Sequence, residues 1–399
     1  MRRASCAGIG LSTALLATSG LSIAAELPSQ EEMWRIIQEQ QREIEALKKG
    51  QKTTEEKAEA AVEMAEQSRD TTSTTASWAE RTQIGGYGEL HYNNLDTDDG
   101  RKKEIDFHRF VLFFGHQFTD RLRFWSELEL EHAISGDGED GEIELEQAYI
   151  EYDLTPSQHV KGGLFLIPVG ILNETHEPPT FYGVERNPVE RNIIPTTWWA
   201  GGAELTGEIA PGWSYNFGVH EGLETDSYNI RSGRQKTSEA DAHDLASTAR
   251  VKWNGIAGVE LAATVQYQEN ITQGLDNDAS AWLYEAHADI QRGPLGLRAL
   301  YARWDIDGDG ARAAGRDEQD GFYVEPSYKL LPEFGVFVRY SQWDNEAGSS
   351  SDSEKKQYNA GFNYWPHPDV VLKADYQKQD NEGNVDEEDG INLGIGYQF

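Results

Sequence analysis

From Gln83 to the C-terminus the chain alternates apolar and polar residues, and this alternation limits its possible folds more than any other feature. The last segment shows it most clearly, with apolar residues at every second position: Ile391, Leu393, Ile395, Tyr397 and Phe399. The residues between them are polar or glycine. Because successive side chains of a β-strand point to opposite faces, a period of two predicts a strand with one apolar and one polar face.

The same pattern returns in many segments, for example 257–270, 279–291 and 355–365. Their apolar positions are rich in Tyr, Trp and Phe, and their polar positions carry charged residues in mid-strand. A soluble β-sandwich would also alternate, but its apolar face would be an aliphatic interior. An aromatic exterior around a charged interior is instead typical of a membrane-spanning β-barrel. The mean hydropathy of -0.65 agrees, because such strands need only about 9–11 alternating residues.

We count about sixteen strands between residues 83 and 399, including a third strand at 121–135 and a sixth at 202–210. Short turns such as Pro211-Gly212 and Gly293-Pro294 alternate with long polar loops. Outer-membrane barrels have an even number of strands, with short turns at one end and long loops at the other. The sequence therefore predicts an all-β fold: a sixteen-stranded antiparallel transmembrane β-barrel preceded by a short N-terminal coiled-coil helix.

Four segments precede or form this barrel. Residues 1–25 resemble a secretory signal peptide, with Arg2 and Arg3 before an apolar core, and they contain Cys6, the one cysteine of the chain. Residues 26–67 form heptads with Met33 and Ile37 on the apolar seam, which predicts a periplasmic helix that is either a thin coiled coil or a lone charged helix. Residues 68–82 are a Ser/Thr-rich linker, and residues 83–399 are the barrel.

Several motifs connect the chain to a known family. They are FLIPVG at 165–170, ETHEPPTFYG at 174–183, PTTWW at 195–199, GGYGELHY at 85–92 and the terminal YQF at 397–399. Together they resemble the family of phosphate-selective porins O and P over residues 83–399. The resemblance implies a homotrimeric porin in the outer membrane of a Gram-negative bacterium, with its third loop folded into the pore. It does not specify phosphate as the solute.

The loop at 168–201 is too long to be a simple connector and is rich in proline and aromatic residues. Folded inward, it would narrow the channel. Its charged residues are our candidates for the pore constriction: Glu185, Arg186, Glu190 and Arg191. The alternative is that these side chains pair with each other or with the wall and only hold the loop in place.

Basic residues whose position in the alternation points inward gather near the short periplasmic turns. We predict a lumen basic ring formed by Arg123, Lys161, Arg250, Lys252, Arg298, Lys329 and Lys373. Such a ring could draw anions through the inner mouth. The alternative is that each base extends along the wall and pairs with an adjacent acid.

The formal charge of -34 excludes nucleic-acid binding through the bulk field of the protein. We predict no catalytic residues, no cofactor and no metal site, because no nucleophile motif or cysteine cluster is present. The function we expect is passive diffusion of ions and small polar solutes across the outer membrane, in contact with its lipid. The sequence leaves a preference for anions or phosphate open. The alternatives are a cation-preferring general porin, a structural protein or adhesin with the helix as periplasmic tether, and an outer-membrane enzyme.

Overall fold

The computed structural model describes residues 78–399 except 136–137, 139–140, 275–276 and 383–386. The strands are β1 (Thr82–Thr97), β2 (Gly100–Thr119), β3 (Leu122–Glu131), β4 (Ile143–Thr155), β5 (Gln158–Leu166), β6 (Trp199–Ala210), β7 (Trp213–His220), β8 (Ala246–Ile256), β9 (Val259–Gln268), β10 (Ser280–Arg292), β11 (Leu295–Asp307), β12 (Glu318–Leu331), β13 (Phe334–Asp344), β14 (Lys355–His367), β15 (Val370–Asn381) and β16 (Asp389–Gln398). Short helices are η1 (Pro178–Thr180), α2 (Pro188–Asn192), η2 (Arg231–Gly233) and α3 (Asp309–Ala314).

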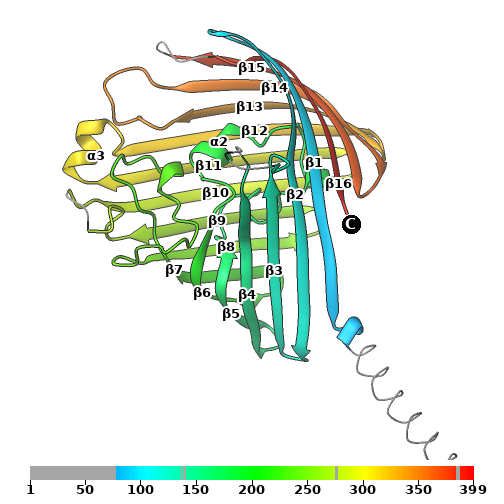
Figure 1. Cartoon of the computed structure of the whole chain (residues 1–399), viewed down its shortest axis with the longest axis vertical. Coiled ribbons are helices and arrows are strands. Elements are labelled where there is room, and N and C mark those ends of the chain that lie inside the picture. The colour runs from blue at the N-terminus through cyan, green and yellow to red at the C-terminus, as the bar shows by residue number, and fades with distance from the viewer. Residues whose placement is uncertain (1–77, 136–137, 139–140, 275–276, 383–386) are drawn as a thin grey trace, which may run out of the picture. The chain divides into compact units, whose positions relative to one another are not determined.

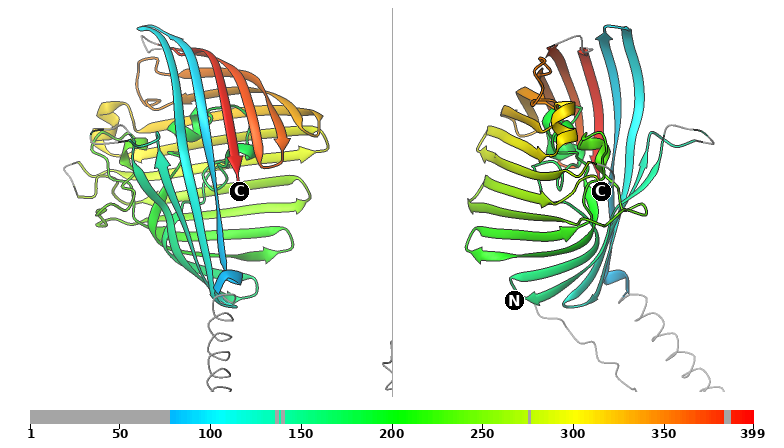
Figure 2. Two further views of the ribbon diagram at one scale, coloured as in Figure 1. Left: turned by 45° about the vertical axis from the view of Figure 1, so that its right-hand side comes forward. Right: turned by 90° about the vertical axis from the view of Figure 1, so that its left-hand side faces the viewer.

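The sixteen strands form one closed antiparallel barrel, which confirms the predicted fold class for this part of the chain. Each strand pairs with its neighbours in sequence, and β1 pairs with β16 from Tyr87–Gln398 to Asp96–Asp389. Closure leaves no free sheet edge, so every strand finds backbone hydrogen-bond partners on both sides. Figure 2 shows the ring of strands from two further sides.

The barrel has an inverted distribution of apolar and polar side chains. On β16, Ile391, Leu393 and Ile395 are exposed, whereas Asn392 between them is fully buried. Charged residues such as Glu129 and Arg339 are also buried, inside the ring. An exposed apolar exterior requires lipid around it, because water would solvate this surface at high cost.

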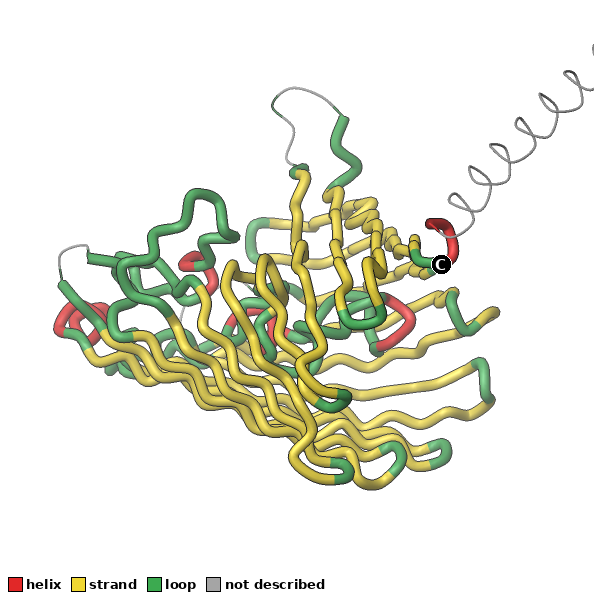
Figure 3. The backbone as a smooth tube through the Cα atoms, turned by 90° about the horizontal axis from the view of Figure 1, so that it is seen from below, coloured by secondary structure: helices red, strands yellow, loops and turns green. Residues whose placement is uncertain are grey.

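From β2 onward, short turns and long loops alternate along the chain, as the sequence predicts (Figure 3). Some boundaries differ: β3 ends at Glu131 rather than 135, and β6 begins at Trp199 rather than 202. The sequence predicts strands at 83–95 and 104–118 with a loop at 96–103 between them, but β1 and β2 continue to a tight hairpin around Asp98 and Asp99. Among the described residues, no helix is long and apolar enough to cross a bilayer.

Residues 167–198, between β5 and β6, form the longest of these connections and lie inside the ring of strands. Their helix α2 packs against β12 and β13, and η1 packs against β1, β15 and β16 (Figure 1). Buried apolar side chains of this loop form the main hydrophobic cluster together with inward residues of β10–β13: the loop contributes Ile167, Val169, Val189, Ile193, Ile194 and Trp198. The barrel interior is therefore a packed structure in which the loop has a defined position.

The predicted signal peptide and N-terminal helix lie outside the described residues. Of the predicted linker, only residues 78–82 are described: residues 78–80 form one helical turn, and Thr82 already belongs to β1.

Candidate constriction site

The long loop is held at its base by Asn173, a fully buried amide. Its Nδ2 donates to the carbonyls of Ile167 and Trp198, each at 2.8 Å, and its Oδ1 accepts from the Trp198 amide at 2.7 Å. One side chain thus joins the two ends of a connection of some thirty residues. Such a clamp gives the loop a fixed path from the point where it leaves the wall.

Glu190 holds the middle of the loop. Its carboxylate accepts from the amides of Ile171 and Leu172, both at 2.6 Å, from Asn187 Nδ2 at 2.8 Å and from the Tyr323 hydroxyl at 3.0 Å. The side chain is completely buried. Hydrogen bonds to an ionised group are the strong ones in proteins, and four of them satisfy this carboxylate fully.

The barrel wall also binds the loop backbone at many points. Arg298 of β11, Arg339 of β13 and Asn363 of β14 donate to the carbonyls of Thr180, Tyr182 and Phe181, at 2.9, 2.5 and 2.9 Å. These contacts satisfy backbone oxygens that would otherwise be buried without partners. Residues 180–182 of the loop are therefore attached to three strands of the barrel wall, β11, β13 and β14.

Two cavities lie on either side of this attached segment. The inner cavity, about 740 Å³, is lined by Phe181 and Tyr182 together with residues of the short turns. The outer cavity, about 230 Å³, is lined by Glu185 and Arg186 and by Arg191. The two cavities share no lining residue. The segment 181–186 thus stands between the inner and outer mouths.

Four arginines gather beside this segment, and we call them the arginine cluster: Arg186, Arg191, Arg231 and Arg234. Arg186 donates to Thr197 Oγ1 at 2.7 Å, Arg231 to the Thr196 carbonyl at 3.0 Å, and Arg234 to the Thr197 carbonyl at 2.5 Å. Arg231 also donates to the carbonyl of Arg191 at 2.8 Å. Within the described part of the chain, none of the four has a carboxylate within 4.0 Å.

The mutual repulsion of the four arginines in the cluster is not offset by ion pairs. Burial and the neighbouring charges of Arg234, Arg191 and Arg186 lower the pKa of Arg231 to about 9. Burial, together with the charge of Arg109, also lowers the pKa of Arg186, whose Nη2 is buried without a hydrogen-bond partner. These guanidinium groups stay protonated at neutral pH, and an anion bound among them would relieve their repulsion.

Acids of β3 and β4 act on the arginine cluster from beyond ion-pair distance. Burial lowers the pKa of Arg234, and the charges of Glu144, Glu146 and Glu131 oppose this shift without cancelling it. The site therefore has bases on two loops and acids on the neighbouring wall. Such an arrangement produces an electric field across the space between them.

The structure gives different surroundings to the four residues proposed for the constriction. Glu185 accepts from His91 Nδ1 and Asn93 Nδ2, both at 3.1 Å, and burial is outweighed by the His91 charge, which lowers its pKa. Arg186 and Arg191 line the outer cavity and belong to the arginine cluster. Glu190, fully buried, holds the loop together. The structure brings the two arginines together but places the two glutamates in separate hydrogen-bond networks.

The seven residues of the predicted basic ring are engaged in close contacts. Five have acidic partners: Arg123 with Glu151 and Asp153, Lys161 with Glu204 at 3.3 Å, Arg250 with Glu174, Lys252 with Glu260 at 3.3 Å, and Arg298 with Asp289 at 3.0 Å. The remaining two, Lys329 and Lys373, lie over the rings of Trp365 and Phe181, at 4.9 and 3.4 Å from the ring centroids. Five of the seven ring residues thus have an acidic partner, whereas none of the arginine cluster has one among the described residues.

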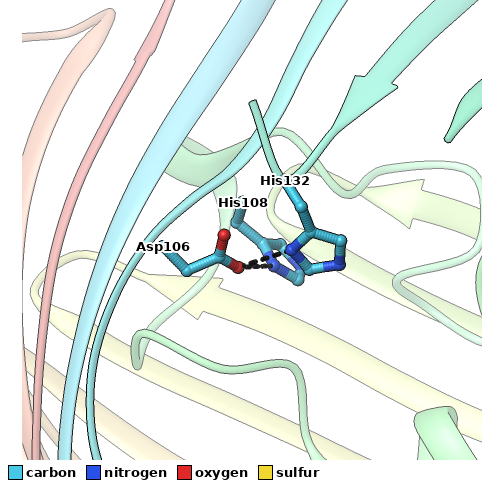
Figure 4. Close-up of side chains that lie close together, drawn as sticks. All are labelled: Asp106, His108 and His132. Atoms are coloured by element: carbon cyan, nitrogen blue, oxygen red, sulfur yellow. Dashed lines mark hydrogen bonds and ion pairs between the residues drawn. The ribbon is translucent and has the colours of Figure 1, made fainter. Parts of the chain in front are cut away.

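A group of histidines lines the outer cavity. Asp106 Oδ2 lies 3.0 Å from His108 Nδ1 and 2.9 Å from His132 Nδ1 (Figure 4). A β-bulge, with a register shift between Glu89 and His91, allows His108 and its neighbour Arg109 to contact each other. Arg109 donates to His108 Nε2 at 2.9 Å, so the proton of a neutral His108 is on Nδ1, facing Asp106.

Sequence reasoning did not identify Arg231 and Arg234. They lie in the connection between β7 and β8, whose path cannot be read from periodicity. One signal was available: Arg231, Arg234 and Lys236 lie within six residues, in a chain with an excess of acids. The structure brings this basic stretch beside Thr196–Thr197 of the long loop.

Comparisons with solved structures support the fold. The anion-selective porin of Comamonas acidovorans is 14% identical, with a TM-score of 0.58, over 80% of this chain and 99% of that one. The outer-membrane channel DcaP of Acinetobacter baumannii is 16% identical, with a TM-score of 0.57, over 80% and 97%. OmpT of Vibrio cholerae in its trimer form is 12% identical, with a TM-score of 0.54, over 80% and 100%.

Sequence comparisons identify the family. An uncharacterized protein of Aquifex aeolicus (strain VF5) is 34% identical over 346 residues, covering 76% of this chain and 77% of that protein. The family model described as phosphate-selective porin O and P matches residues 83–399, which is the whole barrel. The chain therefore belongs to the family of phosphate-selective porins O and P, and it is an outer-membrane porin channel rather than an enzyme.

Proposed function

We propose that this porin prefers anions, and that the arginine cluster, rather than the basic ring, selects them. The observation that carries the proposal is the absence of carboxylate partners around Arg186, Arg191, Arg231 and Arg234 in the described residues. An ion pair presents little net charge to a passing solute, whereas an unpaired guanidinium presents its full charge. In a confined space of low effective dielectric this charge acts strongly.

Phosphate is a suitable solute chemically. Guanidinium groups donate in a planar fork that matches the oxygen atoms of phosphate or carboxylate. The four arginines come from two loops, two from each, and Arg186 retains a buried donor without a partner. The family description agrees with this chemistry.

The test is the reversal potential of single channels in a KCl gradient across a planar bilayer. Replacing Arg231→Gln and Arg234→Gln together should shift the anion-to-cation permeability ratio toward cations by roughly tenfold. Two charges about 8 Å from an ion, at an effective dielectric of about 20, each contribute ~2 kcal/mol before screening by salt. The control is Arg312→Gln, because Arg312 lies in an exposed loop and pairs with Asp307 and Asp309.

A cation-preferring general porin is the second proposal, and a specific observation favours it. Glu127, Glu129, Glu144 and Glu146 form a row of buried acids on β3 and β4. If these acids select the ions, the unmodified channel will pass K⁺ in preference to Cl⁻. The double arginine variant will then strengthen that preference only slightly.

We further propose that the barrel assembles as a homotrimer and that residues 26–67 form a periplasmic coiled coil, as the family resemblance and the heptads suggest. The barrel closes between β1 and the C-terminal end from Gly86 onward, where Gly86 exchanges two backbone hydrogen bonds with Phe399, so closure does not use residues 27–77. Deleting residues 27–77 should leave a conducting channel. Gel migration of unheated samples and cross-linking would report the number of chains with and without the segment.

A further inference from the structure

Three buried side chains beside the long loop direct polar atoms at each other without hydrogen-bond partners. His176 of the loop, Glu127 of β3 and Glu146 of β4 are 3%, 2% and 1% exposed. His176 Nε2 lies 3.6 Å from Glu127 Oε1 and 3.6 Å from Glu146 Oε2. All three of these atoms are buried and lack a hydrogen-bond partner. Three such atoms at one point require a compensating group.

Direct hydrogen bonds do not account for this arrangement. Distances of 3.6 Å exceed the range of about 2.7–3.2 Å for an N–H···O bond. Burial opposes protonation of His176, but the two carboxylates raise its pKa to about 10, so an imidazolium held by both acids is the competing arrangement. One Nε2–H cannot make good bonds to both oxygens at that separation, and one carboxylate would stay unsatisfied.

The surroundings of the three residues prepare the ligand atoms. His176 Nδ1 lies 3.3 Å from the Asn173 carbonyl, which can only accept, so Nδ1 carries a proton. In the neutral ring the Nε2 lone pair therefore faces the acids. Gln147 donates to Glu127 Oε2 at 2.6 Å, which leaves Oε1 free. Carbonyl and amide partners of this kind commonly orient the histidine and carboxylate ligands of metal ions.

We infer that His176, Glu127 and Glu146 bind a divalent transition-metal ion of the Zn²⁺ class. Zn–N and Zn–O bonds of about 2.0–2.2 Å in a tetrahedron place neighbouring ligand atoms about 3.4 Å apart, close to the separations observed. The mixed nitrogen and oxygen set suits Zn²⁺, whereas Ca²⁺ takes about 6–8 oxygen ligands. The Tyr87 hydroxyl, also buried without a partner and in a ring 5.8 Å from that of His176, is a candidate for the fourth position.

The ion would attach the long loop to a part of the wall that the hydrogen bonds described above do not reach. Those bonds lead from the loop to β1, to β8 and to strands β11–β14. A metal ion held by His176 would extend the attachment to β3 and β4. The acids that act on the arginine cluster lie on the same two strands. Because the three ligands are almost fully buried, the site has the closed character of a structural metal centre.

The histidine group of the outer cavity differs in one decisive respect. There Arg109 donates to His108 Nε2, so Nδ1 must carry the proton and has no lone pair for a metal. At His176 the group beside Nδ1 is an acceptor, so in the neutral ring the Nε2 lone pair faces the carboxylates. The inference therefore concerns His176 and does not extend to Asp106, His108 and His132.

The inference is tested on the full mature protein extracted from membranes. The protein is stripped with a chelator, loaded with ZnSO₄ and freed of excess ion, and its zinc is measured by mass spectrometry. We expect one Zn²⁺ per chain, which is lost in His176→Gln and in Glu146→Gln. The matched control is His159→Gln, since His159 Nδ1 lies 2.5 Å from Asp153 Oδ1 but is more exposed. The control variant should retain the ion.

Two further measurements separate metal loss from misfolding. Gln147→Ala keeps all three ligands and should weaken Zn²⁺ binding by roughly 10–100-fold, as is usual when a partner of a ligand is removed. Co²⁺ in place of Zn²⁺ should give the unmodified protein the visible absorption of a tetrahedral site. The His176→Gln variant should lack this absorption while it still migrates as a folded barrel. Equal zinc retention in His176→Gln and His159→Gln, or no retained zinc in the unmodified protein, would overturn the inference in favour of an imidazolium between two acids.

Discussion

The arginine cluster and the basic ring contain the same kinds of side chain but differ in what surrounds them. Ring residues such as Lys161 and Lys252 emerge from regular strands, where acids on neighbouring strands lie beside them. Arg231 and Arg234 emerge from a loop and point at backbone carbonyls of a second loop. In a barrel wall a base readily finds an acid two residues or one strand away. Loops that meet inside the lumen can keep charges uncompensated, and this makes them suitable for selecting ions.

The largest effect on ion preference is expected when the hydrogen bonds that hold the long loop in place are removed. Glu190→Ala removes a buried carboxylate that accepts four hydrogen bonds, which should cost the loop about 3–5 kcal/mol of its attachment. We expect a larger and noisier single-channel conductance with a reduced ion preference. Glu318→Ala, at a partly exposed glutamate of β12, is the control. Unchanged conductance would mean that the loop does not limit the passage.

A smaller effect is expected when bases of the ring are neutralised. Arg250→Gln and Lys252→Gln together should shift the reversal potential toward cations, by less than half the shift of the Arg231 and Arg234 double variant. The double change also leaves the negative charges of Glu174 and Glu260 without partners, and these charges contribute part of the shift. If the ring variant has the larger effect, the selective region lies at the inner mouth, as the sequence first indicated.

Removing both members of an ion pair tests whether the paired bases of the basic ring contribute to ion preference. Lys252→Gln with Glu260→Gln leaves the net charge unchanged and should move the reversal potential by only a few millivolts, on the order of the error of the measurement, because the charges of a pair nearly cancel at a distance. The measurement is again the KCl gradient. A large shift would show that the pair does not act as a compensated unit.

The smallest effect should come from pH. Since the lowered pKa of Arg231 is still about 9, the arginine cluster keeps its charge at lower pH, and the anion preference should stay constant from about pH 5.5 to 7.5. It should decline only as pH rises through about 9. Reversal potentials at stepped pH check this. A marked change near pH 6.5 would mean that a histidine, and not the arginine cluster, controls the ion preference.

Most of the barrel could be predicted from the sequence, because strand alternation is a local property. The period of two identifies the face of each residue, so the strand count and the inward direction of Arg250 or Lys161 follow from neighbours along the chain. The ends of β3 and β6 and the first hairpin were less exact, since they depend on pairing across strands. The position of Arg231 could not be predicted at all, because it depends on contacts between loops more than thirty residues apart.

The partner of a charged residue was also beyond sequence reasoning. That Lys252 meets Glu260 follows once the register of β8 and β9 is known, but periodicity does not give the register. The convergence of His176 with Glu127 and Glu146 requires, in addition, the path of the long loop. Chemistry assembled from distant segments therefore becomes visible only in three dimensions.

The wall contacts of the long loop have a consequence for the order of assembly. Arg298, Arg339 and Asn363, which bind the loop carbonyls, follow the loop in the chain by more than a hundred residues. Contacts between such distant segments form late, because the intervening chain must first be ordered. The narrow part of the passage is thus completed only when the last strands arrive. An unfinished barrel would contain a loop without its anchors, and the channel would acquire its filter and its closed wall in the same final step.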